Sequence, residues 1–248
     1  MKLLIIVPAY NEQESIVPLM SDLVSFRAGF IKKHGLDSLD ILIVNDNSKD
    51  LTLSLAKRND DVTVLDLPIN LGIGGTVQAG YAFAYRNGYD YAIQLDGDGQ
   101  HFPAYIDELY SEISSRKIDM VIGSRYLKGL NDNFRSTFMR RIGKGLISLL
   151  IKGLYKKEIT DPTSGFRIVN KKLIGLFADY YPYDYPEPES LAICFRHGFS
   201  VGEVSVKMKE RNGGKSSISN IGSAYYMLKV FIAILIDYFK PLKVKYDL

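Results

Sequence analysis

The sequence predicts an α/β fold in which a mostly parallel β-sheet is flanked by helices. Short β-branched runs alternate along the chain with segments of helical spacing, which is the order of a parallel sheet with crossover helices. Polar clusters follow directly after several of these runs, at the strand ends where such sheets bind ligands. With 248 residues, 46% of them hydrophobic, the chain is long enough for one large domain or two small ones.

Composition narrows the function classes. A net charge of +3 is too small to imply nucleic-acid binding. The single cysteine, Cys194, cannot form an internal disulfide, and the apolar run after Met1 ends at Pro8 and is too short for a secretory signal peptide. We therefore expect a cytoplasmic protein without a nucleic-acid partner.

Apolar runs in the first half of the chain predict five strands, over 3–7, 40–44, 62–65, 91–95 and 119–122. Helices are expected over 15–33, around 51–56 and over 76–86. Pro8 ends the first strand, and turn and N-cap residues follow the second at 45–48. The glycine-rich loop over 70–75 precedes the third helix, and such a loop can bring backbone N–H groups close to a phosphate.

Positive charge is concentrated in the segment 134–157, which contains basic residues but no acidic one. On a helix of 3.6 residues per turn its cations share one side and its apolar residues share the opposite side. The cations are Arg140, Arg141, Lys144 and Lys152, and the apolar residues are Met139, Ile142, Leu146, Leu150 and Leu154. A basic amphipathic helix often lies on an anionic membrane surface, but packing of its apolar side on the core explains the pattern equally well.

The C-terminal segment 223–239 is nearly apolar and is broken by Lys229 and Asp237. Its apolar stretches are shorter than the about 20 residues that a membrane-spanning helix needs. Lysines follow it, so a helix at the membrane interface fits, and a dimer contact or a helix packed on the rest of the chain fits nearly as well. We expect a main domain over 1–217 and a C-terminal apolar helix over 218–248.

The strongest chemical signal is the run LDGDGQH over 95–101, directly after a predicted strand. Asp96 and Asp98 supply two carboxylates on one turn and Gln100 supplies a neutral oxygen, which suits a hard divalent cation that also binds substrate phosphates. Surface turns often carry the same pattern, so alone it is weak evidence. The glycine-rich loop lacks the Gly-Lys-Ser/Thr of a nucleotide-triphosphate loop, and no GxGxxG follows the first strand, which disfavours an ATPase and an NAD-dependent enzyme.

Seven blocks occur in one order along the chain: VPAYNEQE (7–14), IVNDNSKD (43–50), NLGIGGTVQAG (70–80), LDGDGQH (95–101), IGSRY (122–126), DPTSGFR (161–167) and ERNGGKSS (210–217). Together they closely resemble glycosyltransferase family two, with the Rossmann-like GT-A fold, and its dolichyl/polyprenyl-phosphate sugar synthase branch. The resemblance covers residues 2–217. It implies a nucleotide-sugar site lined by Pro8, Tyr10, Glu12, Asp46, Asn70, Gly75 and Asp96.

The resemblance also implies a Mg²⁺ or Mn²⁺ site formed by Asp96, Asp98 and Gln100, where the metal stabilises charge on the leaving nucleoside diphosphate. It assigns catalytic roles to Asp98, Arg125, Asp161 and Arg211. The acceptor phosphate falls to Arg125, Arg140 or Arg141, Arg211 and Lys215. Asp161 would orient the acceptor or act as a base.

The chain departs from the family pattern in three places. Asn45-Asp46-Asn47 stands where many relatives carry consecutive aspartates, and Gly143-Lys144 stands where the branch often has a serine. The segment YPEPES over 185–190 looks more like bacterial surface-polysaccharide members of the superfamily. Glu187 and Glu189 of this segment stand beside prolines and are expected to be ordinary loop charges.

These observations predict an inverting, metal-dependent glycosyltransferase that uses a UDP- or GDP-sugar and acts at the inner face of the cell membrane. The favoured acceptor is a polyprenyl phosphate, in cell-surface glycan synthesis. The alternative acceptor is a sugar hydroxyl of a lipid-linked glycan, which would need a general base. A nucleotidyltransferase and a non-catalytic binding module are more remote. A homodimer or a separate membrane-anchor protein would be the protein partner.

Overall fold

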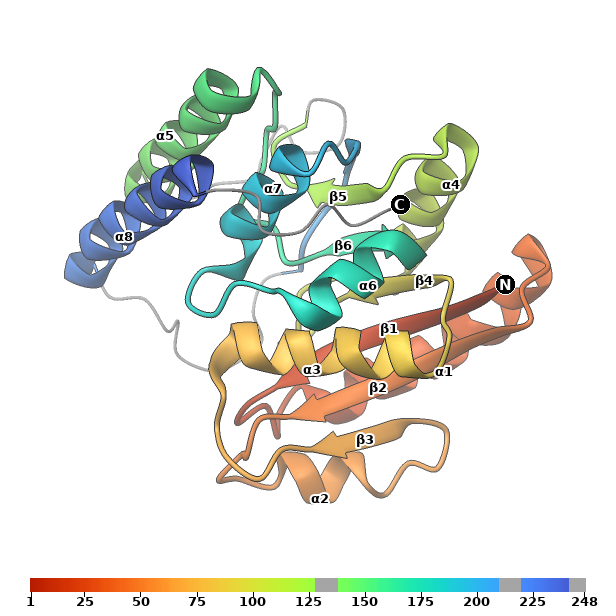
Figure 1. Ribbon diagram of the computed structural model, residues 1–248. Helices are drawn as coiled ribbons and strands as arrows, with labels where there is room; N and C mark the ends of the chain where they lie inside the picture. The colour runs from red at the N-terminus through yellow and green to blue at the C-terminus, as the bar shows by residue number, and fades with distance from the viewer. Residues whose placement is uncertain (128–137, 210–219, 241–248) are drawn as a thin grey trace.

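The computed structural model describes residues 1–127, 138–209 and 220–240, and side chains within these ranges except at 138–142 and 220–227. Its centre is a seven-stranded sheet in the order β3-β2-β1-β4-β6-β5-β7 (Figure 1). The strands are β1 (Lys2–Ala9), β2 (Ser38–Asn45), β3 (Thr63–Asp66), β4 (Tyr91–Gln94), β5 (Met120–Ser124), β6 (Arg167–Asn170) and β7 (Val201–Ser205). The five strands expected in the first half are present, and the α/β fold is confirmed.

The sheet is parallel except at one strand. β1 pairs in parallel with β2 and β4, β2 with β3, and β5 with β7. β6 runs antiparallel between β4 and β5. Because β6 is reversed, its first residue, Arg167, lies at the same edge of the sheet as the carboxyl ends of β4 and β5, opposite Gln94 and Ile122.

Helices cover both faces of the sheet. One hydrophobic core is built with α1 (Ile16–His34), α2 (Thr52–Ala56) and α4 (Ile106–Arg116). The other is built with α3 (Gly72–Arg86), α5 (Phe138–Tyr155), α6 (Lys171–Asp179), α7 (Pro186–Arg196) and α8 (Asn220–Phe239). Alternate residues of β1 enter the two cores, as the two-residue period of a strand requires: Leu3, Ile5 and Val7 on one face, Leu4 and Ile6 on the other.

Helix α3 begins at Gly72, four residues earlier than the sequence predicts. The backbone N–H groups of Leu71 and Gly72 donate to the two carboxylate oxygens of Asp46, at 2.6 and 3.0 Å. A Cβ on Gly74 would stand 2.2 Å from the backbone oxygen of Tyr183, so only glycine fits there. Gly74 therefore serves close packing, and the N–H groups of Leu71 and Gly72 are bonded to a side chain rather than directed at a phosphate.

Helix α5 is amphipathic, and its packed side matches the expected one in part: Leu150 and Leu154 pack against the core as expected. Ile147 and Ile151 are its fully buried residues, whereas Leu146, expected on the packed side, is 49% exposed. Leu149 is 67% exposed. The helix therefore packs through the side that carries Ile147 and Ile151. It turns a second apolar strip, formed by Leu146 and Leu149, toward solvent.

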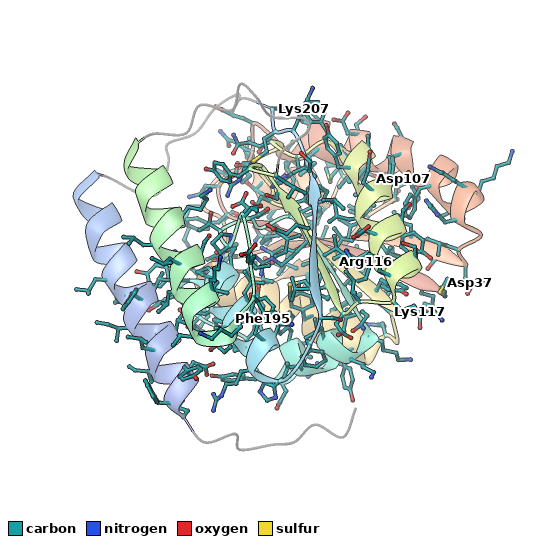
Figure 2. The ribbon with its side chains drawn as sticks, turned by 90° about the horizontal axis from the view of Figure 1, so that it is seen from above. Asp37, Asp107, Arg116, Lys117, Phe195 and Lys207 are labelled. Atoms are coloured by element: carbon teal, nitrogen blue, oxygen red, sulfur yellow. The ribbon has the colours of Figure 1, made fainter. Side chains whose placement is uncertain are left out.

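The C-terminal helix α8 packs on α7 and α5, and Figures 1 and 2 both show α5 and α8 side by side. Val230 and Ile234 are buried in the core. Asp237 forms a salt bridge with Arg196 of α7, at 3.1 Å. In the part of the chain that the structure describes, no helix is long and apolar enough to cross a membrane.

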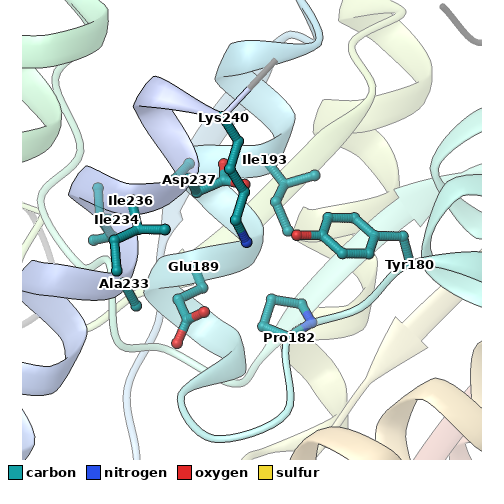
Figure 3. Close-up of a pocket in the computed structure, with 10 residues that line it drawn as sticks. Tyr180, Pro182, Glu189, Ile193, Ala233, Ile234, Ile236, Asp237 and Lys240 are labelled. Carbon is teal, nitrogen blue, oxygen red and sulfur yellow. The ribbon is translucent and has the colours of Figure 1, made fainter. Parts of the chain in front are cut away.

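A cavity of about 230 Å³ remains between α7 and α8 (Figure 3). Glu189 projects into it from the first turn of α7, Asp237 lines it from α8, and Lys240 lines it just after the end of α8. Burial, reinforced by the negative charges of Asp184 and Asp237, raises the pKa of Glu189 to about 7 against the attraction of Lys240. Glu189 therefore carries a proton over part of the neutral range.

The Glu189→Gln variant is expected to be less sensitive to pH in its stability than the wild type. The folded-state pKa lies above the unfolded value, so the contribution of Glu189 to stability is fully present below about pH 4.5 and is lost as pH rises through about 7. Discounted for solvent, the effect is about 1 kcal/mol, or about 2–4 °C in Tm. Calorimetry should show that the Tm of the variant relative to that of the wild type is higher by this amount at pH 8 than at pH 5. An equal Tm difference at both pH values would contradict the assignment.

Candidate active site

The polar clusters that follow the strands meet at one edge of the sheet. The parallel strands β1, β2 and β4 end there at Ala9, Asn45 and Gln94, and the reversed β6 starts there. The register thus brings Asp46, Asp96 and Arg167 to a common edge. The sequence predicts the first two positions, but it does not reveal the reversed strand that supplies the third.

The Asp96–Asp98 turn is enclosed by two close backbone contacts. A Cβ on Gly97 would stand 2.7 Å from the carbonyl oxygen of Pro8 at the end of β1. A Cβ on Gly165 would stand 2.7 Å from Oδ1 of Asp96. Glycine at both positions lets the turn sit against β1 and lets the SGFR segment approach the Asp96 carboxylate.

Asp96 is held in its ionised form by surrounding cations. Burial alone would raise its pKa, but the hydrogen bond with Nε2 of His101, at 3.3 Å, and the charges of Arg125 and Arg167 outweigh burial and lower it. His101 is 2% exposed and its ring lies 4.8 Å from that of Phe166. The buried His101 ring therefore holds the Asp96 carboxylate from the protein interior.

The residues of the expected metal site offer an incomplete set of oxygen ligands. Oδ1 of Asp98 accepts a hydrogen bond from the backbone N–H of Gln100, at 3.0 Å, and Nε2 of Gln100 donates to the backbone oxygen of Lys209, at 3.3 Å. Among the described residues, no three His, Cys, Asp or Glu side chains gather to hold a metal ion. Two carboxylates and one amide oxygen fit a Mg²⁺ or Mn²⁺ ion that takes its other ligands from phosphate and water.

The segment before residue 210 is fastened along this turn. The backbone N–H of Lys209 donates to the carbonyl of Gln100, at 2.8 Å, and Met208 pairs with His101 as an isolated bridge. The residues expected to follow, Arg211 and Lys215, lie outside the described part of the chain. The backbone of Arg140 and Arg141 lies in the first turn of α5, and their side chains are outside the described set.

Arg125 and Asp161 form a buried bidentate ion pair. Nε and Nη2 of Arg125 donate to the two carboxylate oxygens of Asp161, at 2.7 and 2.8 Å, and Nη2 also donates to Thr163. Asp161 is fully buried, and although burial raises its pKa, the bonded Arg125 guanidinium lowers it below its usual range. A carboxylate so bound has low affinity for a proton, which disfavours the predicted role of Asp161 as a base and suits a role in positioning Arg125.

The residues expected around the nucleotide are gathered at the ends of β1 and β2. Tyr10 is 46% exposed, and the carboxylate of Glu12 accepts a hydrogen bond from Ser15, at 2.9 Å. Nδ2 of Asn70 donates to the backbone oxygen of Asp46, at 3.1 Å. Tyr10 is thus open to a ligand, whereas the 3% exposed Asp46 uses its carboxylate to hold the loop that follows β3.

Gly75 lies inside α3, where a Cβ would stand 2.6 Å from Cβ of Leu71 and 3.5 Å from the hydroxyl oxygen of Tyr183. Gly75 is therefore held by close packing against Leu71 and Tyr183.

Two polar residues at this edge had no role assigned from the sequence. Arg167 is fully buried and donates to the backbone oxygens of Ser164 and Glu187 and to the hydroxyl of Ser190. Glu187 lies in the first turn of α7, not in a loop. Burial raises the pKa of the Glu187 carboxyl, and Asp96 adds to this against Arg167 and Arg125. Arg167 ends the DPTSGFR block and Glu187 lies in YPEPES, but only the reversed β6 shows that they share the site.

Comparison with known proteins decides the family. The model of glycosyl transferase family 2 matches residues 4–176, more than half of the chain. The chain belongs to glycosyltransferase family 2. A dolichyl-phosphate beta-glucosyltransferase of Trichomonas vaginalis is 30% identical over 93% of this chain and 71% of its own length. A polyprenol monophosphomannose synthase of Mycolicibacterium smegmatis is 29% identical over 92% of this chain and 84% of its own length.

Among solved structures, this glycosyltransferase resembles glucosyl-3-phosphoglycerate synthase of Mycobacterium tuberculosis, crystallised with Mn²⁺, UDP and phosphoglyceric acid. The TM-score is 0.69 at 18% identity, over 98% of this chain and 80% of that one. At this identity the match establishes the shared fold, in agreement with the GT-A expectation.

The Asp161→Asn variant is expected to lose stability, because it leaves the Arg125 cation buried without its partner. Breaking a buried pair costs about 3–5 kcal/mol, which corresponds to a fall in Tm on the order of 10 °C. Glu112→Gln, which removes the exposed pair with Arg116, is the matched control and should change Tm by less than about 3 °C. An Asp161→Asn variant with unchanged Tm and abolished turnover would instead restore Asp161 as a base.

Proposed function

We propose that this glycosyltransferase moves a sugar, with inversion, from a UDP- or GDP-sugar to a polyprenyl phosphate. The observation that carries the proposal is that relatives named for dolichyl-phosphate and polyprenol-phosphate sugar transfer match more than 90% of this chain. The strand-end site supplies what the reaction requires: anionic ligands for a metal on one side and a buried cation on the other.

The donor would bind across the ends of β1, β2 and β4. Pro8 and Tyr10 flank the space beside the Asp96–Asp98 turn, where the base and ribose would lie. Asp96, Asp98 and Gln100 would hold Mg²⁺ or Mn²⁺. When bound, that metal supplies positive charge that stabilises the departing diphosphate. His101 and Arg167 keep Asp96 ionised and therefore able to bind a cation.

The acceptor phosphate would bind on the Arg125 side. Nε and Nη2 of Arg125 donate to Asp161 and Thr163. Its third nitrogen, Nη1, has no hydrogen-bond partner among the described residues and can donate to a phosphate. Lys144 of α5 lies 3.8 Å from the ring centroid of Tyr126, the neighbour of Arg125. A phosphate acceptor is an anion at neutral pH. Cations such as Arg125 and Lys144 are therefore enough to bind it, and no base is needed to activate it. We propose Arg140 or Arg141, Arg211 and Lys215 as further cations of the acceptor side.

A sugar hydroxyl is the second acceptor, and the geometry disfavours it. A hydroxyl has a high pKa and needs a base, and Asp161 is bound to Arg125 through both oxygens. A nucleotidyl transfer would release pyrophosphate, whereas glycosyl transfer releases a nucleoside diphosphate.

We further propose that α5 and α8 rest on the inner face of the cell membrane. The large apolar side chains exposed on these two adjacent helices are Leu146, Leu149, Leu228, Phe231, Ile232, Ile236, Tyr238 and Phe239. Lys156 and Lys157 are exposed just after α5 and suit anionic head groups. In this proposal the region 218–248 is a membrane contact rather than a separate enzyme unit. The alternative is that a second copy of the chain or an anchor protein covers the same surface.

The Asp98→Asn variant is expected to abolish metal-dependent donor turnover and leave the fold intact, because it removes charge but not volume. The measurement is Mn²⁺ titration by calorimetry, with nucleoside diphosphate release as the second readout. The control is Asp22→Asn, which makes the same change on α1 and removes only the ion pair between Asp22 and Lys209. It should bind Mn²⁺ as the wild type does. Undiminished Mn²⁺ binding by Asp98→Asn would show that this turn is not the metal site.

The acceptor is tested by supplying a short polyprenyl phosphate and the matching polyprenol in parallel. The phosphate should stimulate nucleoside diphosphate release from one UDP- or GDP-sugar, without pyrophosphate, and the alcohol should not. Stimulation by the alcohol alone, or release of pyrophosphate, would contradict the proposal.

The Leu149→Asp variant is expected to weaken binding to anionic liposomes roughly tenfold, the loss expected for one apolar side chain of this size. Leu51→Asp is the control, since Leu51 is 61% exposed but lies beside α2, away from α5 and α8 (Figure 1). Co-sedimentation at low and high salt separates the apolar part from the screened electrostatic part. If the wild type remains in the supernatant at low salt, the membrane contact is wrong and α8 is better explained as a dimer interface.

A further inference from the structure

Two glutamates of α7, two residues apart, face different surroundings. Each helix residue is turned by about 100° from the last, so Glu187 and Glu189 point about 200° apart. Glu189 enters the cavity beside α8 (Figure 3). Glu187 instead lies close enough to Asp96, Arg167 and Arg125 for their charges to act on it. Its carbonyl oxygen also accepts a hydrogen bond from Arg167, which lies opposite Gln94 at the end of β4, so Glu187 belongs to the strand-end site.

The main chain at Glu187 is fixed by two donors. Nη1 of Arg167 donates to the carbonyl oxygen of Glu187, at 3.2 Å, and to Oγ of Ser190, at 2.8 Å. Oγ of Ser190 donates to the same carbonyl, at 3.0 Å. Because Arg167 starts β6, these bonds set the first turn of α7 at a fixed position relative to Asp96 at the end of β4.

The Glu187 carboxylate is partly buried, and in the described part of the chain it takes a hydrogen bond only from its own backbone N–H. The two nearby arginines do not pair with it directly. Arg167 donates to Ser164, Ser190 and the Glu187 carbonyl, and the bonded N–H groups of Arg125 are used on Asp161 and Thr163. A carboxylate has room for about four hydrogen bonds, so this partly buried one, with a single bond within its own residue, is well suited to accept hydrogen bonds from a ligand.

The order of the strands indicates which part of the donor would lie there. The proposed base and ribose region lies at β2 and β1, and the proposed metal and diphosphate region lies at β4. The next strand along is β6, whose first residue holds the start of α7. A sugar joined to the diphosphate therefore extends from Asp96 toward Glu187. Its ring hydroxyls are neutral donors, which a carboxylate flanked by already bonded cations can accept.

We propose that the Glu187 carboxylate binds a ring hydroxyl of the donor sugar and so selects which hexose the enzyme accepts. The proposal rests on the proposed function, because it assumes a nucleotide-sugar donor at Asp96. Arg167 acts as the positioning residue, which holds the backbone of Glu187 in place.

The test combines Glu187→Gln with donors that each lack one ring hydroxyl. The preferred UDP- or GDP-hexose is first identified by thermal shift with Mn²⁺, and its 2-, 3-, 4- and 6-deoxy forms are then compared by calorimetry and by transfer kinetics. For wild type, one deoxy donor should bind roughly 10- to 100-fold more weakly than the parent, the span for a hydrogen bond to a charged group. For Glu187→Gln, the parent should weaken and that deoxy donor should not weaken further, so the two losses do not add.

Glu189→Gln is the matched control, with the same change two residues away on the other side of α7. It should keep the wild-type ratio between parent and deoxy donors. Nucleoside diphosphate affinity, measured without a sugar, should be unchanged in Glu187→Gln, which shows that the variant is folded and that the nucleotide site is intact. If no nucleotide sugar binds the wild type, the proposed function itself fails.

Two results would overturn the Glu187 assignment while leaving glycosyl transfer in place. One is that every deoxy donor shows the same ratio to the parent in wild type and in Glu187→Gln. The other is unchanged donor affinity with a strongly reduced kcat and loss of one ionisation from the pH profile, which would make Glu187 a base for a hydroxyl acceptor.

Discussion

A group of charges where β4, β5 and β6 meet, fully buried at Asp161 and Arg167 and partly buried at Asp96 and Glu187, is the constraint on which the site depends. Asp96, Asp161 and Glu187 bring negative charge to this place, and Arg125 and Arg167 bring positive charge. A charge withdrawn from water without a partner is costly, and four of the five groups have one. Asp161 is bonded to Arg125, Arg167 to backbone carbonyls and Asp96 to His101, so their positions and ionisation are set together.

The reversed strand β6 creates this arrangement. It carries Arg167 to the edge where the parallel strands end, and it brings Gly165 against the Asp96 carboxylate. The same short segment, 161–167, supplies Asp161 to Arg125. One connection therefore positions the proposed metal turn, the proposed acceptor cation and the start of α7. We infer that substitutions in this segment will disturb donor and acceptor binding together.

Much of the fold could be predicted from the sequence, because β-branched runs and helical spacing are local signals. The five strands expected in the first half and the long amphipathic α5 are examples. The start of α3 at Gly72 was not predictable, because it depends on Asp46 accepting two backbone N–H groups across the loop. The outward strip of α5 was missed because which apolar side is buried depends on α7 and α8.

The candidate site was predicted only in part, because some of its residues form local patterns and others meet only through long-range contacts. The Asp96–Asp98 turn is a local pattern after a strand, and the family resemblance singled out Arg125. Neither local pattern nor spacing could show that Asp161 is fully buried against Arg125, or that Arg167 fixes the carbonyl of Glu187. Those contacts join residues 20 or more positions apart through a strand whose direction the sequence does not reveal.

The central claim is that the acceptor is a phosphate, held by cations and needing no base. Its consequence is a specific new bond, in which the sugar carbon joins an oxygen of the lipid phosphate and the nucleoside diphosphate leaves. Phosphorus NMR of the full chain with Mg²⁺, a polyprenyl phosphate and the donor it binds reports that bond directly. The account predicts that the phosphate monoester signal is replaced by a diester signal in step with free nucleoside diphosphate. An unchanged monoester signal, while sugar accumulates on a glycan hydroxyl, would contradict it.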